Sequence, residues 1–256
     1  AGRHSERSSL VLIWLQCTDA AEAARERHRL EDEWYRERGE EIWVAEKRAH
    51  LALVEFRAGN WKLARELIDR SCAELEPVGF QGPLGMPLWT RAKLDAHTGR
   101  IEEARATLLP MLEDARRRPG NAWFTTFLLE TLGFAALTEG DFAGADRAFT
   151  ELGDLLESIG ARVPLAVRTD ADHIEAAVGL GDLERARLLL ARFAQRAESA
   201  PRAWTRQVLP RRGRSSPRPR AIQPEPWLCS SRRPRRRSCR STTRGTCSCG
   251  ASCSDG

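Results

Sequence analysis

The 256-residue chain is 41% apolar, which is enough for a folded core, and has a formal net charge of +5. Its longest apolar run near the start, residues 10–15, is too short to span a bilayer and lacks a secretory cleavage pattern, so a cytoplasmic protein is expected. The charge is uneven: residues 207–256 carry +10, with 12 Arg and two acids, whereas residues 1–206 carry −5. The sequence therefore predicts an acidic body, residues 1–206, joined to a compositionally different tail, residues 207–256.

The body contains a recurring turn motif, Gly-x-apolar-x-x-Ala. It occurs four times at spacings of 40, 41 and 41 residues, with its glycine and alanine at Gly59 and Ala64, Gly99 and Ala104, Gly140 and Ala145, and Gly181 and Ala186. A degraded copy near residue 18 has Thr18 in place of the glycine and Ala23 in the small position. A fixed period of this length indicates stacked structural repeats.

Each repeat is expected to be an antiparallel pair of helices, because apolar residues at helical spacing lie on both sides of each turn. The glycine would end the first helix in the left-handed conformation, and Asn60, Asp141 or Asp182 would cap the second. The alanine would allow close helix approach. Apolar residues further along would contact the next unit; these are Leu67, Ile68, Leu108, Met111, Phe149, Leu152, Leu188 and Leu189.

Prolines support these boundaries, since Pro83, Pro87, Pro119 and Pro164 fall between the hairpins. Pro110 is the exception, and it is expected to kink or shorten its helix. The predicted fold is an all-α solenoid of helix hairpins with a period of 40–41 residues and an extended concave surface for a partner or ligand.

The glycine turn, the small residue five positions later and the Arg-, Ala- and Leu-rich helices resemble tetratricopeptide-type repeats, whose usual period is about 34 residues. More narrowly, residues 54–61 and 135–142 look like the sensor region of large LuxR-family, MalT-like ATP-binding transcriptional regulators. The resemblance covers about residues 10–210. It implies that the repeats bind a protein or small-molecule inducer, and that this binding is coupled to ATP-dependent self-assembly and DNA binding.

In that family a P-loop ATPase domain precedes the repeats and a helix-turn-helix domain follows them. Neither pattern is visible here. A P-loop in particular needs a lysine after a glycine, and none of Lys47, Lys62 and Lys93 follows a glycine. Since the chain begins at Ala1, we expect a fragment that holds no cofactor and does not bind DNA specifically, ATP being expected only in the family's N-terminal domain. Self-association is a further expectation. The alternative is a free-standing repeat scaffold or adaptor that joins proteins.

Taken as an in-frame sequence, the tail is open to three interpretations. Its arginine run at residues 232–237 could contact phosphate backbones, Cys247, Cys249 and Cys253 could bind a metal, or the segment could be disordered. A shifted reading frame explains more. Only 3 of the 41 basic residues are Lys, which indicates a GC-rich gene. If the third codon positions are taken as mostly G or C, the translations allowed one base out of frame from about Arg212 include alanine-rich helical sequence, in which a Gly-x-x-x-x-Ala begins at residues 220–221, 40 residues after Gly181.

No catalytic or metal-binding pattern emerges, so an enzyme is not expected. The histidines His4, His28, His50, His97 and His173 are scattered, and His97 is expected to be a cationic residue at a helix C-terminus. Cys17 and Cys72 are expected to be reduced, apolar helix positions.

The acidic group Asp170, Asp172 and Glu175 is expected to be a solvated helix face, with a ligand or metal site as the alternative. Residues 31–33 and 36–41 are expected to be a charged helix surface rather than a catalytic carboxylate pair. The body is also rich in tryptophan. Most of these side chains should pack between helices, and one or two could anchor a ligand on the concave surface; they are Trp14, Trp34, Trp43, Trp61, Trp89, Trp123 and Trp204.

Overall fold

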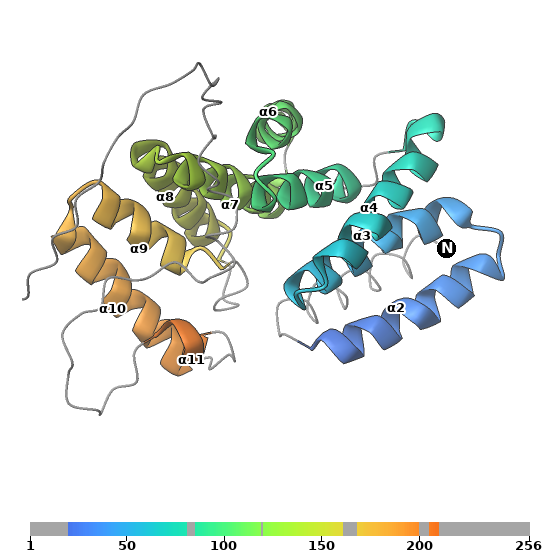
Figure 1. Ribbon diagram of the computed structural model, residues 1–256, viewed down its shortest axis with the longest axis horizontal. Helices are drawn as coiled ribbons and strands as arrows, with labels where there is room; N and C mark the ends of the chain where they lie inside the picture. Colours follow the sequence, from blue (N-terminus) through green and yellow to red (C-terminus); the bar gives the residue numbers. More distant parts are fainter. Residues whose placement is uncertain (1–19, 81–84, 119, 161–167, 200–204, 210–256) are drawn as a thin grey trace, which may run out of the picture. The chain divides into compact units, whose positions relative to one another are not determined.

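The computed structural model describes residues 20–80, 85–118, 120–160, 168–199 and 205–209, whose regular secondary structure is entirely helical (Figure 1). The α-helices are α2 (Ala21–Arg36), α3 (Glu41–Arg57), α4 (Trp61–Leu75), α5 (Met86–His97), α6 (Ile101–Arg117), α7 (Ala122–Glu139), α8 (Phe142–Ser158), α9 (Asp170–Gly179), α10 (Leu183–Ser199) and α11 (Thr205–Val208). A short 3-10 helix, Glu76–Val78, follows α4. The predicted all-α helical-repeat fold is confirmed.

The chain divides into two units, residues 1–214 and residues 215–256. Every described residue belongs to the first unit. The arginine run, the cysteines of the tail and the predicted change of reading frame lie outside the described residues, as do Trp14, Trp204, Cys17 and His4.

Helices pack as hairpins on either side of each turn: α3 with α4, α5 with α6, α7 with α8, and α9 with α10. Each second helix also contacts the first helix of the next hairpin, as α4 does α5, α6 does α7 and α8 does α9. The first helices, α3, α5, α7 and α9, contact one another in sequence order. This nearest-neighbour packing is that of a repeat protein. Among the described helices, none combines the length and the apolar character needed to cross a bilayer.

The turn glycines and the small alanines occupy equivalent places in the four hairpins. Gly59, Gly99, Gly140 and Gly181 have φ of 88°, 84°, 82° and 78°, the left-handed region that a Cβ disfavours. Ala64, Ala104 and Ala145 are completely buried, and Ala186 is 7% exposed. The absence of a longer side chain at these four positions lets each second helix lie close to its neighbours.

Helix capping follows the prediction at the aspartates but not at the asparagine. Asp141 accepts a hydrogen bond from the backbone N–H of Gly144 at 2.8 Å, and Asp182 accepts one from that of Arg185 at 3.0 Å. The Asn60 amide instead donates to Glu55 Oε2 at 2.7 Å, so the predicted cap is wrong there. The carboxylate is a stronger acceptor for that amide, and Asn60 thereby links the end of α3 to the turn.

The first repeat begins one residue later than predicted. Ala23 is exposed, whereas Ala24 is completely buried and lies 40 residues before Ala64. The reason is that α2 starts at Ala21, which makes Ala24 the fourth helical residue, just as Ala64 is the fourth residue of α4. The position equivalent to the turn glycine is therefore Asp19, outside the described residues.

Pro110 does not shorten its helix, since α6 runs through it for 17 residues. Pro110 has no N–H to donate to the Ala106 carbonyl. Because both residues are exposed, water can hydrogen-bond to that carbonyl instead. Leu188 is 53% exposed and does not form the predicted contact, because its position in the repeat faces solvent: the equivalent residues Glu66, Ala106 and Arg147 are exposed as well.

The largest apolar cluster lies among α5, α6 and α7 and includes Trp89, Leu108 and Phe127. Trp89 is 1% exposed, and its Nε1–H donates to the Phe127 carbonyl at 3.0 Å and to Thr131 Oγ1 at 3.1 Å. Because its Nε1–H is hydrogen-bonded, Trp89, the largest side chain of the cluster, can be fully buried. The middle hairpins thus form the most extensive described core.

Candidate recognition surface

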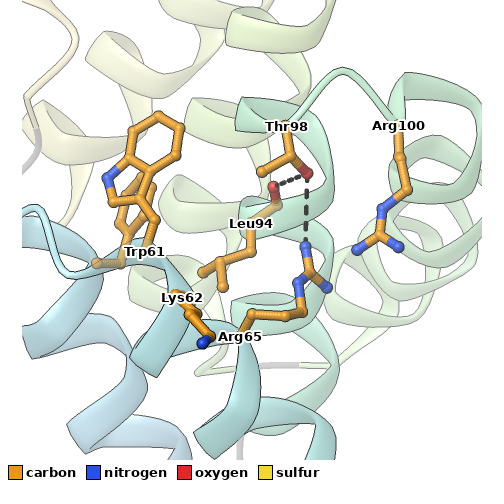
Figure 2. Close-up of a pocket in the computed structure, with 7 residues that line it drawn as sticks. Trp61, Lys62, Arg65, Leu94, Thr98 and Arg100 are labelled. Carbon is orange, nitrogen blue, oxygen red and sulfur yellow. Dashed lines mark hydrogen bonds between the residues drawn. The ribbon is translucent and has the colours of Figure 1, made fainter. Parts of the chain in front are cut away.

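A pocket of about 370 Å³ lies between two successive repeat turns (Figure 2). This volume is within the range of small-molecule and side-chain binding pockets. The lining side chains come from the end of α3, the first turns of α4, the end of α5 and the residue before α6, and they are Phe56, Trp61, Lys62, Arg65, Leu94, Thr98 and Arg100.

The pocket is a consequence of the repeat register. Trp61 is the apolar residue two positions after Gly59, and Arg100 directly follows Gly99. Each glycine reverses the chain in a short turn, so the start of one second helix faces the turn of the next hairpin. Leu94 is almost fully buried at the base, whereas Phe56 and Trp61 are partly exposed.

An aromatic row extends from this pocket across three first helices. Trp61 lies against Phe56 with ring centroids 5.5 Å apart, Phe56 meets the edge of His97 at 4.8 Å, and His97 stacks on Phe134 at 3.9 Å. The row joins α4, α3, α5 and α7. Offset and edge-to-face pairs of this kind add about 0.5–1.5 kcal/mol each beyond apolar burial.

His97 is therefore not the cationic helix end that the sequence predicts. Burial, together with the positive charge of Lys93, lowers the pKa of His97 to about 3. Its neutral ring donates from Nδ1–H to the Lys93 carbonyl at 2.9 Å and stacks on Phe134. A helix dipole contributes too little to offset the desolvation of an imidazolium between two aromatic rings.

Three basic side chains line the rim of the pocket, and each lies beside an acid. Arg65 Nη2 lies 2.9 Å from Asp95 Oδ1, Arg100 pairs with the same oxygen, and Arg65 also donates to Thr98 Oγ1 at 3.5 Å. Arg65 Nη1 lies 3.8 Å from Asp69 Oδ1, and Lys62, which is 93% exposed, lies 3.9 Å from Glu66. An apolar floor beneath this rim of paired charges suits a ligand that combines an apolar or aromatic group with a polar one.

A second feature, buried charge on the first helices, was not predicted. Lys47 and Lys93, two of the three lysines in the chain, are 0% and 4% exposed. Lys47 Nζ lies 3.0 Å from Glu46 Oε2, and Lys93 Nζ lies 3.0 Å from Glu130 Oε1. A signal for both was present in the sequence, because Trp43 and Trp89 each stand four positions before a lysine. The Nζ atoms lie 5.8 and 5.5 Å from these rings.

Glu46 is the acidic centre of the cluster in α3. Burial by itself would raise its pKa, but His50 and Lys47 lower the pKa of Glu46 to about 2. His50 Nε2 lies 3.4 Å from Glu46 Oε1. The carboxylate is thus held ionised inside the protein by two basic neighbours on its own helix.

The acidic stretch in α9 separates into three environments. Asp170 is mostly buried and pairs with Arg196, Asp172 is partly buried near Glu130 and Lys93, and Glu175 is exposed. Burial, aided by the charges of Glu130 and Glu175, raises the pKa of Asp172 to about 7. The expectation of a solvated surface is therefore wrong for Asp170 and Asp172, because α9 packs against α10, α8 and α7.

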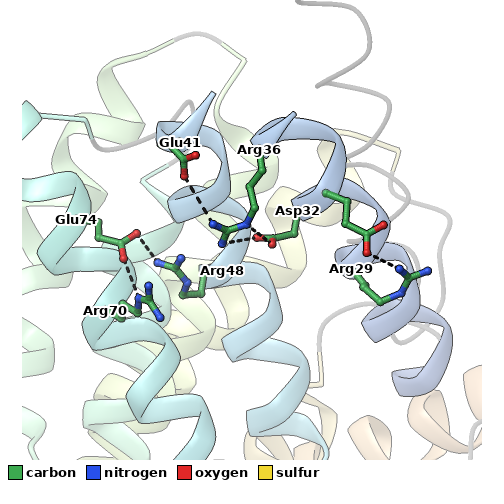
Figure 3. Close-up of polar contacts among 8 residues, drawn as sticks. Arg29, Asp32, Arg36, Glu41, Arg48, Arg70 and Glu74 are labelled. Carbon is green, nitrogen blue, oxygen red and sulfur yellow. Dashed lines mark hydrogen bonds and ion pairs between the residues drawn. The ribbon is translucent and has the colours of Figure 1, made fainter. Parts of the chain in front are cut away.

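Residues 31–33 and 36–41 form a charged surface except at Glu31, which is 5% exposed and paired with Arg27 at 2.6 Å. Figure 3 shows the ion pairs of α2, α3 and α4, including Arg36 Nε with Asp32 Oδ2 at 2.6 Å. In the same view Arg48 joins α3 to Glu74 of α4 at 2.5 Å. Glu31 is buried because Ala24, His28 and Tyr35 share its face of the helix.

The remaining candidates lie between or along helices. Cys72 is buried, and burial raises the pKa of its thiol; burial also lowers the pKa of His28. His173 Nε2 lies 3.1 Å from Asp146 Oδ1. The described tryptophans other than Trp89 are partly buried; these are Trp34, Trp43, Trp61 and Trp123. Of this set, Trp61 lines the pocket between turns.

In the part of the chain that the structure describes, no three His, Cys, Asp or Glu side chains are grouped so as to hold a metal ion. Neither the protein-family models nor the curated proteins compared with the sequence gave a match.

Proposed function

We propose that this chain is a helical-repeat recognition region, the signal-sensing part of a LuxR-type, MalT-like transcriptional regulator. The observation that carries the proposal is the pocket of about 370 Å³ between the turns at Gly59 and Gly99, built from repeat positions rather than from an inserted loop. Repeat proteins use such recurring surfaces for recognition. The Arg- and Leu-rich hairpins and their glycine turns support the choice of family.

The chemistry of the pocket indicates what an inducer or partner would present. Phe56, Trp61 and Leu94 offer an apolar floor, and Lys62, Arg65 and Arg100 lie around it. A ligand that places an aromatic or branched apolar group on Trp61 and a carboxylate or phosphate beside Arg100 would satisfy both. Asp95 keeps Arg65 and Arg100 in place before the ligand arrives, which reduces the entropy lost on binding.

The proposal predicts that the purified chain binds neither ATP nor duplex DNA specifically, since both activities belong to other domains of the family. Fluorescence anisotropy with a labelled ATP analogue and with labelled duplexes of unrelated sequence measures this directly. We expect no saturable ATP binding. DNA binding through the basic tail should be independent of sequence and fall steeply as salt is raised. Saturable ATP binding at micromolar concentration, or a sequence preference that persists in high salt, would contradict the proposal.

The coding DNA around this chain separates the regulator from the scaffold. An in-frame P-loop upstream and a helix-turn-helix downstream would support the regulator. If both are missing from a complete gene, the chain is instead a free-standing scaffold or adaptor.

A further inference from the structure

The last described hairpin, α9 with α10, leaves a group of apolar side chains in water. We call this group the terminal face. Its members are between 40% and 52% exposed, and they are Val178, Leu180, Leu183 and Leu190. Scattered exposed leucines are ordinary on a protein surface, but a group of large apolar side chains in one short stretch of sequence marks a contact that is unfilled.

Comparison of equivalent repeat positions identifies the missing contact. The residue nine positions after the turn glycine is Ile68, Leu108, Phe149 or Leu190, with 0%, 0%, 2% and 40% exposure. In the first three hairpins this side chain shares an apolar cluster with the first helix of the following hairpin, through Leu94, Phe127 and Ala176 respectively. Leu190 differs in having no complete helix on that side within the described residues. The partner that would bury it is therefore another first helix.

The structure contains the beginning of such a helix. The turns at Gly59, Gly99 and Gly140 are followed by first helices that begin at Met86, Ala122 and Asp170. α11 begins at Thr205, after Gly181. The number of residues from Gly181 to Thr205 is larger than the number from Gly99 to Ala122 and smaller than the number from Gly59 to Met86.

The contacts of α11 agree with its position in the sequence. Thr205 is 2% exposed, and Leu209, the residue after α11, packs on Phe193 and Ala197 of α10. The spacing of α11 and the contact of Leu209 match those expected at the start of another first helix.

A shifted reading frame after about residue 210 would encode the remainder of that helix and the helix after it. The shifted frame places its glycine at residues 220–221. The number of residues from the start of α11 to this glycine is intermediate between two values seen in the structure. It is larger than the number from the start of α9 to Gly181 and smaller than the number from the start of α7 to Gly140. The glycine position that the shifted frame allows therefore agrees with the helix start seen in the structure.

We propose that the terminal face is the docking surface for a further helical hairpin of the same chain, which α11 begins and which is encoded one base out of the present frame after about residue 210. The hairpin would place apolar residues of its first helix on Leu190, as the earlier hairpins do at the equivalent position. The inference does not depend on the proposed regulatory function.

The test compares the 256-residue chain with the product of a gene in which one base is restored between codons 210 and 212. Amide hydrogen exchange should slow in α9 and α10 by about tenfold or more, because the new helix removes local opening of α10. The melting temperature should rise by several degrees. Exchange in α2 and α3 should be unchanged, since a repeat contacts only its neighbours.

A matched pair of variants assigns the effect to the terminal face. Leu190→Ala should hardly change the melting temperature of the present chain but should lower that of the restored chain by several degrees. Leu109→Ala is the control, because Leu109 is also a leucine of a second helix and is 50% exposed despite a complete following hairpin. It should have little effect in either chain.

Several outcomes would overturn the proposal. These are unchanged exchange in α10 of the restored chain, failure of that chain to fold cooperatively, and an equal effect of Leu190→Ala in both chains. A concentration-dependent dimer of the present chain that Leu190→Ser dissociates would show that a second copy covers the face. Sequencing is decisive as well: if no single-base change at codons 210–212 opens a repeat-like frame, there is no such hairpin.

Discussion

At the residue scale, the protonation states of His97 and Asp172 make stability depend on pH in opposite directions. The pKa of His97 is about 3 in the folded protein and 6.5 in the unfolded chain. Between these values the unfolded chain binds more protons, so acid favours unfolding. Stability from the neutral ring is complete above pH 6.5 and is lost as the pH falls toward 3, by at most about 1.4 kcal/mol per pH unit.

His97→Phe should remove this dependence, because phenylalanine keeps the stack on Phe134 and does not titrate. Urea unfolding at pH 7, 6, 5 and 4 measures the effect. The stability of the variant relative to the parent should rise at each step toward acid. Parallel curves for the two proteins would show that His97 titrates normally and that the stack with Phe134 does not exclude water.

Asp172 supplies the opposite control. Its pKa is about 7 in the folded protein and 3.8 unfolded, so the folded state binds more protons between these values and stability falls as the pH rises through them. Asp172→Asn removes that loss, and the variant should gain stability relative to the parent as the pH rises from 4 to 7. The two substitutions should therefore change the pH profile with slopes of opposite sign.

The residue types alone do not predict that these charged side chains are buried. Lys, Glu and Asp are read from a sequence as surface residues, since an unpaired buried charge is costly. Lys93 with Glu130, and Lys47 with Glu46, avoid that cost by pairing inside the protein. Such pairs join residues on the same helix or on helices far apart in the chain, so a one-dimensional apolar pattern cannot reveal them.

At the scale of elements, the close approach of α7 and α8 depends on a glycine that is not in a turn. A Cβ on Gly133 would lie 2.5 Å from Cε1 of Phe149, a side chain that is 2% exposed. Alanine is the better helix former by about 1 kcal/mol, but here it would have to displace a buried ring. We expect Gly133→Ala to be destabilising overall, by about 1–3 kcal/mol.

Gly153→Ala is the matched comparison. Gly153 lies in α8, and a Cβ there would meet nothing within 4 Å. This substitution should stabilise the protein by about 0.5–1 kcal/mol, because only the helix preference changes. Urea denaturation midpoints of the two variants and the parent test the difference. Equal stabilisation by both would mean that Phe149 does not pack against α7 as described.

The sequence predicts elements better than it predicts the candidate site. The hairpins and their turns follow from glycine chemistry and apolar periodicity, which are local. The pocket at Trp61 and the row from Phe56 through His97 to Phe134 combine residues of successive repeats. Their formation depends on the angle at which hairpins stack, which the pattern does not specify. The first repeat was misplaced by one residue for a related reason, since Ala20, Ala21, Ala23 and Ala24 offer the same small side chain at several registers.

At the scale of the whole molecule, a recurring ion pair joins one repeat to the next. Arg65 and Arg105 both lie six positions after a turn glycine, and Arg25 lies six after Asp19. Arg25 Nε meets Glu55 at 2.7 Å, Arg65 Nη2 meets Asp95 at 2.9 Å, and Arg105 Nη2 meets Glu139 at 2.5 Å. Each acid belongs to the first helix of the following hairpin. The pairs therefore fix the register between neighbours more than they add stability.

This nearest-neighbour organisation predicts a gradient of local stability along the chain. α6 lies between two complete hairpins and shares the largest apolar cluster, whereas α10, among the described helices, packs on α9 and on only the single turn of α11. In a repeat protein the free energy of local opening depends on the contacts with adjacent repeats. Amides around Ala186 should therefore exchange faster than those around Ala104, although both alanines occupy the same repeat position.

Hydrogen exchange followed by mass spectrometry on peptides from α4, α6, α8 and α10 measures this gradient. The four helices differ little in length, at 15 to 17 residues, and each starts directly after a turn, so intrinsic helix fraying should be similar. Faster exchange in α10 alone would then reflect its missing neighbour. Equal protection in α6 and α10 would mean that the hairpins unfold as one cooperative unit, in which case the exposure of Leu190 would carry no local energetic cost.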